Sequence, residues 1–515
     1  MESKQNSSVI IIGAGIAGLS SAHYLINKFG FKDVKILEAL ARPGGRVNTI
    51  FHNGKPLEFG AQFIHNYDTD IYRLAKKLHN VDEDTAESSE ICIMLNEYQF
   101  SARLPLKFHT QFEDNVTTQA LRNQCKSIPS ECEILLPQVQ QSVVSTFVKR
   151  NRKKFIAQNR AKLLSIHGCN SVPAYSAANN SRHNSCIAQT MEHIENPETM
   201  LFYNLLVRFS NAIINHDYGC PSVDFLSYRA FTEYEVPPDE PDDVYILPAP
   251  YGYRKIVDHL IDELPIGTIA YNTKVILIDY SDPKRVQLTT QTGDTYNADH
   301  VIVTASIGNL RAYLNDLFQP PLPERKRKAI QNIGWGGVEK VMLFYDYSLS
   351  HVLPIGGYFC LDQVDNSSQT PKFLSQTIVQ LLPFHNNIVL IWIPASSTSF
   401  IRQVPLDELK SNVVKELCDT FKTDEFLNPV RVVRTDWGDQ DVFRGSYCYW
   451  SKAFDDSGCK HSDLSDPMFS EVDGVNVPRI LFAGEATSPN HYSTVHGAYE
   501  TGERDAKRLD SFYST

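Results

Sequence analysis

The first apolar stretch of the chain predicts a buried β-strand. Val9 to Ile12 is an uninterrupted run of β-branched residues, which is typical of a strand covered on both faces. A segment with apolar residues at helical spacing follows from about Ala17 to Lys28. Val34 to Leu37 is a second apolar run and predicts another strand. The order strand, helix, strand predicts an α/β unit at this end of the chain.

Further along, the apolar pattern alternates between strand-like and helical segments. From about Asp70 to Asn215 it predicts helices, for example over 134–147 and 197–214, and Phe225 to Phe231 then reads as a strand. The later segments predict a meander of strands that ends in 298–305, strands over 341–344, 388–393 and from 481, and helices up to about 264, around 326–330, and over 406–421. A last helix opens within 492–498 and runs to about 509. This alternation predicts a chain of the α/β class.

Composition limits the class of protein and of partner. A chain of 515 residues, 42% of them hydrophobic, is long enough for two or three domains. It has no apolar run that would span a bilayer and no secretory signal, so we expect a cytoplasmic protein. The basic residues within 149–154 could be a nuclear localisation signal, although a solvated helix face is the simpler interpretation. The net charge of −11 disfavours a nucleic-acid partner and suits a cationic substrate.

The ten cysteines show no pattern that predicts a metal site. They contain no C-x-x-C pair and no repeated spacing, which argues against zinc and against a disulfide framework. We therefore expect reduced thiols and no metal.

A glycine-rich turn joins the first predicted strand to the first predicted helix. Its spacing is G-x-G-x-x-G, which allows a tight turn, a close approach of pyrophosphate and close packing of helix on strand. Glu38 follows the last glycine by 20 residues and ends the second strand, where an acid binds the ribose of an adenine dinucleotide. NAD and FAD both remain open from this unit alone. The residues expected to hold the dinucleotide are Gly13, Ala14, Gly15, Ile16, Ala17, Gly18 and Glu38.

Several further segments resemble the flavin-containing amine oxidase family, and in particular animal spermine oxidases and N1-acetylpolyamine oxidases. They are Gly44-Gly45-Arg46, residues 56–65, residues 318–340, Phe443-Arg444-Gly445-Ser446-Tyr447, residues 481–487 and Tyr492-Ser493-Thr494-Val495-His496-Gly497-Ala498. The resemblance implies a Rossmann-type FAD-binding domain interleaved with an α+β substrate-binding domain that carries a helical insertion. The implied limits are 1–90, 244–325 and 440–515 for the FAD-binding domain, and 91–243 and 326–439 for the substrate-binding domain.

The resemblance also implies which residues contact FAD. Arg46 is expected at the pyrophosphate, Glu485 at the ribityl chain or pyrophosphate, and the backbone of Val275 at the adenine. Backbone N–H groups at the start of the last helix would face the pyrimidine ring of the flavin. The full set beyond the glycine-rich turn is Gly45, Arg46, Gly60, Ala61, Gln62, Val275, Glu485, Thr494 and Val495.

The resemblance further implies a catalytic and substrate-binding set. Lys340 is expected to reach flavin N5 through a water, although a lysine at this position could also be a solvated strand end. Asp217 is expected in the substrate tunnel, with a turn between helix and strand as an equally good interpretation. The remaining expectations are His65 as a catalytic and substrate-binding residue, Ser493 and Thr494 as hydrogen-bond partners of the substrate, and Trp437 and Tyr447 as aromatic walls.

These features together predict an FAD-dependent polyamine oxidase. Its expected reaction is hydride transfer from spermine or an N-acetylated polyamine to flavin, hydrolysis of the imine to an aminoaldehyde and a shorter polyamine, and reduction of O2 to H2O2. The expected partners are the polyamine and O2, without nucleic acid or membrane, and the oligomeric state is open. Two alternatives are a histone lysine demethylase-like amine oxidase and an inactive FAD-binding scaffold. The scaffold is suggested by Asp441-Val442, where relatives usually have Pro-Tyr.

Overall fold

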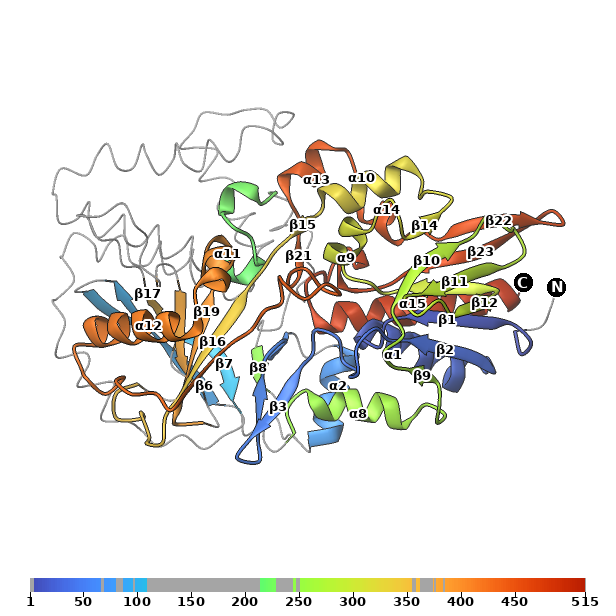
Figure 1. The fold of residues 1–515 in the computed structure, drawn as a ribbon. Helices are drawn as coiled ribbons and strands as arrows, with labels where there is room; N and C mark the ends of the chain where they lie inside the picture. Colours follow the sequence, from blue (N-terminus) through green and yellow to red (C-terminus); the bar gives the residue numbers. More distant parts are fainter. Residues whose placement is uncertain are drawn as a thin grey trace, which may run out of the picture.

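A computed structural model describes most of the chain, and its strands separate into two main groups (Figure 1). The described residues are 4–65, 69–79, 87–95, 98–108, 214–227, 244–246, 251–353, 358–361, 374, 377–382 and 385–514. One group of strands contains β1, β2 and β9, and the other contains β16, β19 and β6, with the α12 helix beside them. The two termini lie near each other at the end of the first group, where the Lys4 ammonium is 2.8 Å from the Asp510 carboxylate.

A mainly parallel sheet forms the centre of the first group. Within the described residues it has six strands, in the order β22-β23-β13-β1-β2-β9, and β22 is its antiparallel edge. The predicted strands over 9–12 and 34–37 are confirmed as β1 and β2, which pair in parallel. The strands are β1 Ser8–Ile12, β2 Asp33–Leu37, β9 Ile269–Ala270, β13 His300–Val303, β22 Met468–Val472 and β23 Val475–Phe482.

Helices and a smaller sheet cover this parallel sheet. Apolar residues of α1, α8 and α15, such as Leu19, Leu260 and Leu509, share one buried core with its strands. The first helix ends in a π-helical turn, and the last helix continues to Ser514, beyond its predicted end near Leu509. The elements are α1 Ile16–His23 with the π-turn η1 Tyr24–Lys28, α2 Asp70–His79, α8 Arg254–Asp262, α9 Ile307–Ala312, α10 Glu324–Asn332, α13 Lys452–Asp456, α14 His461–Ser465, α15 Val495–Ser514, and the strands β10 Val275–Asp279, β11 Val286–Thr290, β12 Thr295–Ala298 and β14 Phe318–Gln319.

A large mixed sheet forms the centre of the second group. In the described parts of the chain it runs β20-β16-β19-β18-β17-β6-β7-β8-β5, and α11 and α12 cover the apolar side of its first strands. The predicted strand over 388–393 and helix over 406–421 are confirmed. The elements are β5 Phe63–His65, β6 Glu87–Leu95, β7 Tyr98–Phe108, β8 Val244–Ile246, β16 Glu339–Phe344, β17 Tyr358–Leu361, β18 Thr377–Leu381, β19 Ile388–Ile393, β20 Arg431–Arg434, α11 Ala395–Gln403 and α12 Leu406–Phe421.

One predicted segment is wrong, and a second is wrong at its start. Residues 87–108 were expected to be helical, but they form the antiparallel pair β6 and β7. Apolar residues alternate with polar ones along most of β7, which is a strand pattern, and β17 and β8 pair with the outer edges of the two strands. Residues 225–231 were expected to be a strand. Phe225 instead ends a 3₁₀-helix, η4 Val223–Phe225, because the Ser222 hydroxyl caps that turn by accepting from the Asp224 N–H, and residues 228–231 lie outside the described residues.

Other predictions fall on residues outside this description or stay open. The predicted helix over 134–147, the basic cluster within 149–154, and the predicted helix over 197–214 up to residue 213 are outside the described residues. The domain limits stay a prediction. β5 and β8, which those limits assign to the FAD-binding domain, pair here with strands of the nine-stranded sheet.

The described residues contain free thiols but neither a membrane-spanning helix nor a metal-binding cluster. None of the helices in these ranges combines the length and apolar character needed to cross a bilayer. No group of three His, Cys, Asp or Glu side chains in the same ranges is arranged to hold a metal ion. Cys220, Cys418, Cys448 and Cys459 are free thiols.

Candidate active site

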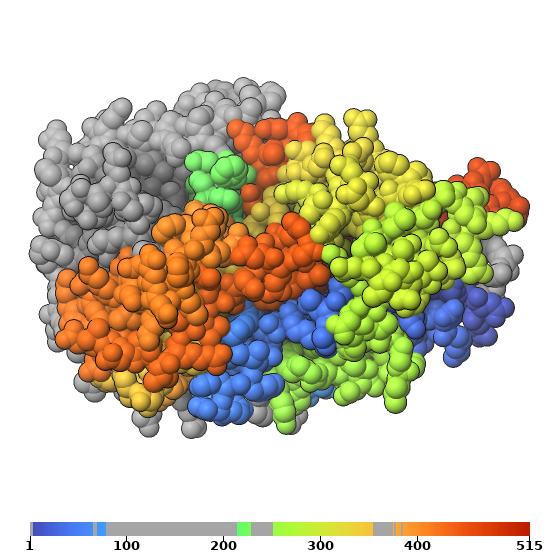
Figure 2. All heavy atoms as spheres, in the orientation of Figure 1, coloured from blue at the N-terminus to red at the C-terminus, as the bar shows by residue number. Residues whose placement is uncertain are grey.

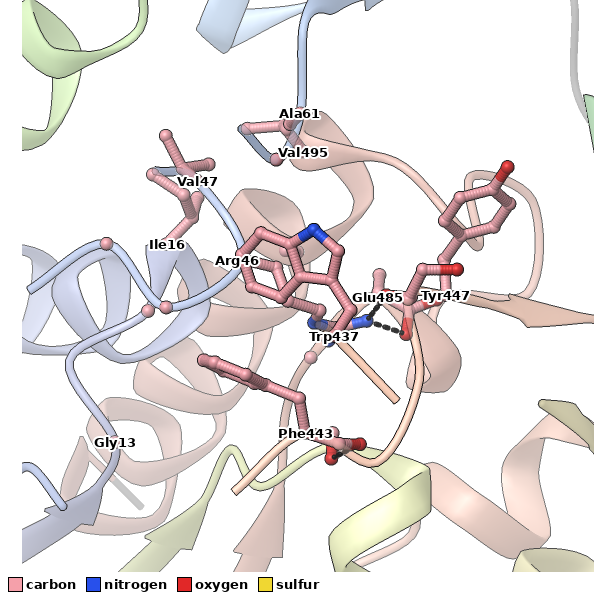
Figure 3. A pocket seen from close by; sticks show the side chains of 18 of the residues that line it. Gly13, Ile16, Arg46, Val47, Ala61, Trp437, Phe443, Tyr447, Glu485 and Val495 are labelled. Carbon is pink, nitrogen blue, oxygen red and sulfur yellow. Dashed lines mark hydrogen bonds and ion pairs between the residues drawn. The ribbon is translucent and has the colours of Figure 1, made fainter. Parts of the chain in front are cut away.

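A cavity of about 390 Å³ is lined by residues from both groups of strands. One end is lined by the glycine-rich turn and Glu38, and the other by Lys340, Trp392 and Tyr447. Figure 3 shows the middle of this cavity, with Arg46 below the Trp437 ring and joined to Glu485. The cavity therefore connects the predicted dinucleotide site with the predicted substrate site.

The glycine-rich turn forms a cradle at the start of α1. Gly15 is the N-cap of α1 and no side chain in the described residues caps it, so the first N–H groups of the helix are available to an anion. A Cβ on Gly15 would meet nothing within 4 Å, whereas a Cβ on Gly18 would lie 2.0 Å from the Gly13 carbonyl oxygen. Gly15 thus leaves space for a ligand, and Gly18 allows the helix to pack closely on the turn.

Glu38 binds the glycine-rich turn as well as lining the cavity. Its Oε2 accepts a hydrogen bond from the Ala14 N–H at 2.6 Å, and its Oε1 accepts one from the Leu40 N–H at 2.7 Å. Burial raises the pKa of the Glu38 carboxyl, and these two N–H groups oppose that shift. Ala14 and Gly18 shape the cradle from behind, while Gly13, Gly15, Ile16 and Ala17 line the cavity directly.

Arg46 joins three segments that the sequence separates widely. Its guanidinium donates to the Glu485 carboxylate and to the Ser446 carbonyl, each at 2.8 Å. The other oxygen of Glu485 accepts from the Ser493 N–H at 2.9 Å. Since Gly45, Arg46 and Glu485 all line the cavity, a cation and a carboxylate are fixed beside the cradle, where a pyrophosphate and a ribityl chain would lie.

The start of α15 completes this part of the wall. Thr494 caps the helix, because its hydroxyl accepts from the Gly497 N–H at 3.0 Å and donates to the His491 carbonyl at 2.7 Å. The Ser493 hydroxyl donates to the Cys448 carbonyl. Both hydroxyls, which were expected to bind substrate, already have protein partners, although Ser493, Thr494 and Val495 all line the cavity.

Lys340 lies on β16 with its ammonium in a ring of acceptors. Nζ donates to the Glu58 carbonyl at 2.7 Å, the Gly60 carbonyl at 2.8 Å and the Gln62 Oε1 at 3.1 Å, and it lies 4.2 Å from the Trp392 ring. Only 3% of the residue is exposed, so it is not a solvated strand end. Burial lowers the pKa of Lys340, and the negative charge of Glu58 opposes this shift.

Glu58 is a partly buried acid next to Lys340. Its carboxylate accepts from the Thr49 hydroxyl at 2.7 Å and the Tyr253 N–H at 2.8 Å. Burial raises the pKa of Glu58, while those two donors and the Lys340 charge oppose the rise. The chain thus places a buried base and a partly buried acid behind Gly60, Ala61 and Gln62 of the cavity wall.

Aromatic rings and one acid surround the far end of the cavity. The Trp437 indole N–H donates to the Phe59 carbonyl at 3.1 Å, and the Tyr447 hydroxyl donates to the His216 carbonyl at 2.6 Å. Asp217 lines the cavity with an exposed side chain in a helical turn over 214–218. That turn fits against Tyr447 because Gly219 has a φ of +62°, and a Cβ there would lie 2.5 Å from the tyrosine ring.

The structure brings together most of the residues expected from the sequence. Val275 lines the cavity where β10 begins. His65 ends β5 and pairs with Val244, but its side chain is outside the description. Sequence analysis missed Glu58 and Trp392, because the contact of a lone acid with a distant lysine and the cross-strand pairing of Trp392 with Lys340 leave no periodic signal.

Comparisons with known proteins show similarity over the whole length. The chain is 27% identical over 558 residues to a probable polyamine oxidase 5 of Arabidopsis thaliana, with 99% of each chain covered. It is 25% identical to the human peroxisomal N(1)-acetyl-spermine/spermidine oxidase, over 98% of this chain and 95% of that protein. The fold resembles the solved cyclohexylamine oxidase of Brevibacterium oxydans IH-35A, with a TM-score of 0.62, 17% identity, and coverage of 99% and 100% of the two chains.

A family model extends this similarity to the cofactor. The model described as flavin containing amine oxidoreductase matches residues 16–510, a range that includes Arg46, Lys340 and the start of α15. The cradle, the Arg46 cation and the uncapped start of α1 fit FAD. Together with the family match, this fit confirms the cofactor and the fold expected from the sequence. The chain belongs to the flavin containing amine oxidoreductase family.

Proposed function

We propose that this FAD-dependent amine oxidase acts on polyamines, with spermine and N-acetylated polyamines as its substrates. The observation that carries the proposal is the position of Asp217, an exposed acid on the same cavity as Lys340, Trp437 and Tyr447. A polyamine has a second cationic nitrogen at a distance from the reacting one, and an acid at the cavity wall would bind it. Aromatic faces would contact the methylene chain and the cations.

In this proposal, His65 binds the substrate near the reacting nitrogen. Trp437 is buried and held by the Phe59 carbonyl, so its ring is a fixed wall. Ser493 and Thr494 would add acceptors at the start of α15, because each hydroxyl donates its proton to a backbone carbonyl and keeps a lone pair that can accept from a substrate N–H. Fixed side chains of this kind orient a substrate without reorganising during the reaction.

Lys340 would hold a water close to the reacting atoms. Its three N–H groups already face three acceptors, so a water can bind only if one acceptor moves. Gln62 is the candidate, because it is the one side-chain acceptor and has the longest contact, 3.1 Å. Flavin, when bound, accepts a hydride from the carbon next to the amine nitrogen and passes the electrons to O2.

The expected products of this reaction are an aldehyde, a shorter amine and H2O2. Loss of a hydride and a proton converts the amine to an imine, and water then hydrolyses the imine to an aldehyde and a shorter amine. Two electrons and two protons reduce O2 to H2O2. The proposed cytoplasmic location and a polyamine as the small-molecule partner belong to the same proposal.

Anaerobic flavin reduction tests the substrate class. We would mix the holoenzyme with spermine, N1-acetylspermine, spermidine or a methylated lysine peptide, and follow the absorbance of oxidised flavin. Rapid bleaching by a polyamine is expected. Bleaching by the peptide alone would favour a demethylase, and absence of bleaching by any of the four would contradict the proposal and favour the scaffold.

A variant of Asp217 tests how the distal nitrogen is recognised. Asp217→Asn should raise the KM for spermine by about tenfold, as expected for loss of one charge-assisted contact, while kcat changes little. Asp224→Asn is the matched control, because Asp224 is an exposed acid on the same segment that does not line the cavity. Equal behaviour of the two variants would remove Asp217 from the substrate site.

A further inference from the structure

The loop between Trp437 and Tyr447 lies between the cavity and the surface. We call residues 439–444 the strap. Val442 and Phe443 of the strap line the cavity. Figure 2 shows the orange-red stretch around residue 440 at the surface, beside the yellow-green residues of the smaller sheet and its neighbours. A ligand in this part of the cavity would therefore have the strap between itself and solvent.

Asp441 joins the strap to the wall that carries the dinucleotide site. Its carboxylate accepts hydrogen bonds from the Lys274 ammonium, from the Arg444 guanidinium and, at 2.5 Å, from the Tyr313 hydroxyl. The Lys274 ammonium also lies 4.9 Å from the centre of the Tyr313 ring, and the Arg444 guanidinium lies 5.3 Å from it. One carboxylate thus holds two cations and a phenol in one cluster.

One partner of Asp441, Lys274, belongs to the part of the cavity lined by Glu38. Lys274 immediately precedes Val275, and both residues line the cavity. The Thr273 N–H donates to the Glu38 carbonyl at 2.7 Å, so the segment that carries Lys274 is bonded to the end of β2. A movement of Asp441 away from Lys274 would therefore separate the strap from the wall formed by Glu38 and Val275.

The strap has a second attachment that does not depend on the Asp441 carboxylate. The Ser306 hydroxyl donates to the Phe443 carbonyl at 2.9 Å, and the Asn309 amide donates to the Asp441 carbonyl at 3.1 Å. These contacts hold the backbone at α9. Neutralising the carboxylate should consequently loosen the side towards Lys274 while the loop stays anchored to α9.

We propose that the strap retains FAD and that Asp441 is its latch. FAD can leave once the Asp441 contacts to Lys274 and Tyr313 open, so these contacts slow its release. Asp441 is 40% exposed, so salt will weaken its ion pairs. The latch works only while Asp441 is ionised, because the negative charge of its carboxylate attracts the Lys274 ammonium. Burial raises the pKa of Asp441, but hydrogen bonds from Lys274, Tyr313 and Arg444 outweigh that effect and hold the pKa well below its usual range.

The release rate of FAD from the holoenzyme tests the latch without any substrate. We would dilute the holoenzyme and follow the rise of free-flavin fluorescence at low and high NaCl. Asp441→Asn and Lys274→Met should each release FAD roughly three- to tenfold faster at low salt. The effects should be less than additive in the double variant, because both substitutions break the ion pair between Asp441 and Lys274. The rate of the wild type should rise with salt, and the rates of the variants should change less.

Two controls separate the latch from a general effect on folding. Asp258→Asn breaks a similarly exposed ion pair, Arg254 with Asp258 on α8, and should leave release unchanged. Thermal unfolding of the apoprotein should be similar for the wild type and the Asp441 variant. Wild-type release rates in both single variants, or fully additive effects in the double variant, would overturn the proposal. Earlier unfolding of the Asp441 variant with unchanged FAD release would also overturn it.

Discussion

The two ends of the cavity are built in different ways. At the dinucleotide end, neighbouring residues of one short segment, Gly13 to Gly18, form the cradle with their backbone. At the amine end, Lys340 is surrounded by Glu58, Gln62 and Trp392, which come from β4 (Lys55–Glu58), the segment after it and β19. Backbone shape therefore controls the first end, and the burial of charged side chains controls the second.

This difference separates two kinds of sensitivity to mutation. A cradle made of backbone fails when a side chain is added, because no rotamer change can make room for it. A ring of acceptors around a lysine fails when the charge is removed, although the fold can remain. The following predictions test this contrast, starting with the largest effect.

Gly18→Ala should damage the fold itself. The new Cβ would lie 2.0 Å from the Gly13 carbonyl oxygen, which neither α1 nor the turn can avoid without moving. We expect a loss of about 3 kcal/mol or more in unfolding free energy, together with loss of bound FAD. Chemical denaturation of the apoprotein and the flavin content of the purified protein measure both effects.

Gly15→Ala is the matched change for the same turn. Its Cβ would meet no atom within 4 Å but would enter the cavity. FAD binding should weaken while the apoprotein keeps nearly its full stability. If both glycine variants lost the same stability, the two roles assigned to these glycines would be wrong.

Lys340→Met should slow flavin reduction or reoxidation by roughly 100-fold and leave FAD bound, since a group that positions a proton or a water contributes on this scale. Stopped-flow absorbance measures both half-reactions. Lys326→Met is the control, because Lys326 is also buried but does not line the cavity. Like Lys340, Lys326 donates to backbone carbonyls, those of Asp463 and Leu464, and lies 4.2 Å from an aromatic ring, that of Phe482. Unchanged rates in Lys340→Met would remove Lys340 from the mechanism.

The stability of the wild type should depend on pH through Lys340. Burial lowers the pKa of Lys340 in the folded protein, so between this pKa and the ordinary lysine value of about 10.4 the unfolded chain binds more protons. Stability therefore rises with pH across this window, by roughly 1 to 3 kcal/mol between about pH 7 and 10, relative to Lys340→Met. Denaturation curves at several pH values give the difference, and the exposed Lys415→Met is the control. Parallel pH curves for the wild type and Lys340→Met would contradict the assignment.

Glu38→Gln should have the smallest effect, a roughly tenfold loss of FAD affinity. The amide keeps one oxygen but cannot accept from both the Ala14 and the Leu40 N–H groups. Fluorescence titration of the apoprotein with FAD measures the affinity. An unchanged affinity would mean that Glu38 neither contacts FAD nor controls the turn that does.

The contrast also explains which parts of the site could be predicted. The glycine spacing and Glu38 are informative because the unit folds locally, so its order in the sequence is its order in space. Residues 87–108 were assigned to the wrong class because their long-range partners in the nine-stranded sheet, and not local helical spacing, determine their structure. The sequence alone shows Asp441 where relatives usually have proline, but its hydrogen bonds with Lys274 and Tyr313 depend on segments far away in the chain.

The sequence by itself determined the α/β class, the dinucleotide cradle and the identity of the cofactor family, because these depend on short motifs and on apolar periodicity. Only the tertiary structure decided the environment of the charged groups. It placed Lys340 among three carbonyl acceptors and left Asp217 exposed at the cavity. It also placed the Ser493 hydroxyl where it donates a hydrogen bond to the Cys448 carbonyl. The physical reason is that burial and hydrogen-bond partners are properties of packed neighbours, and those neighbours are distant in the chain.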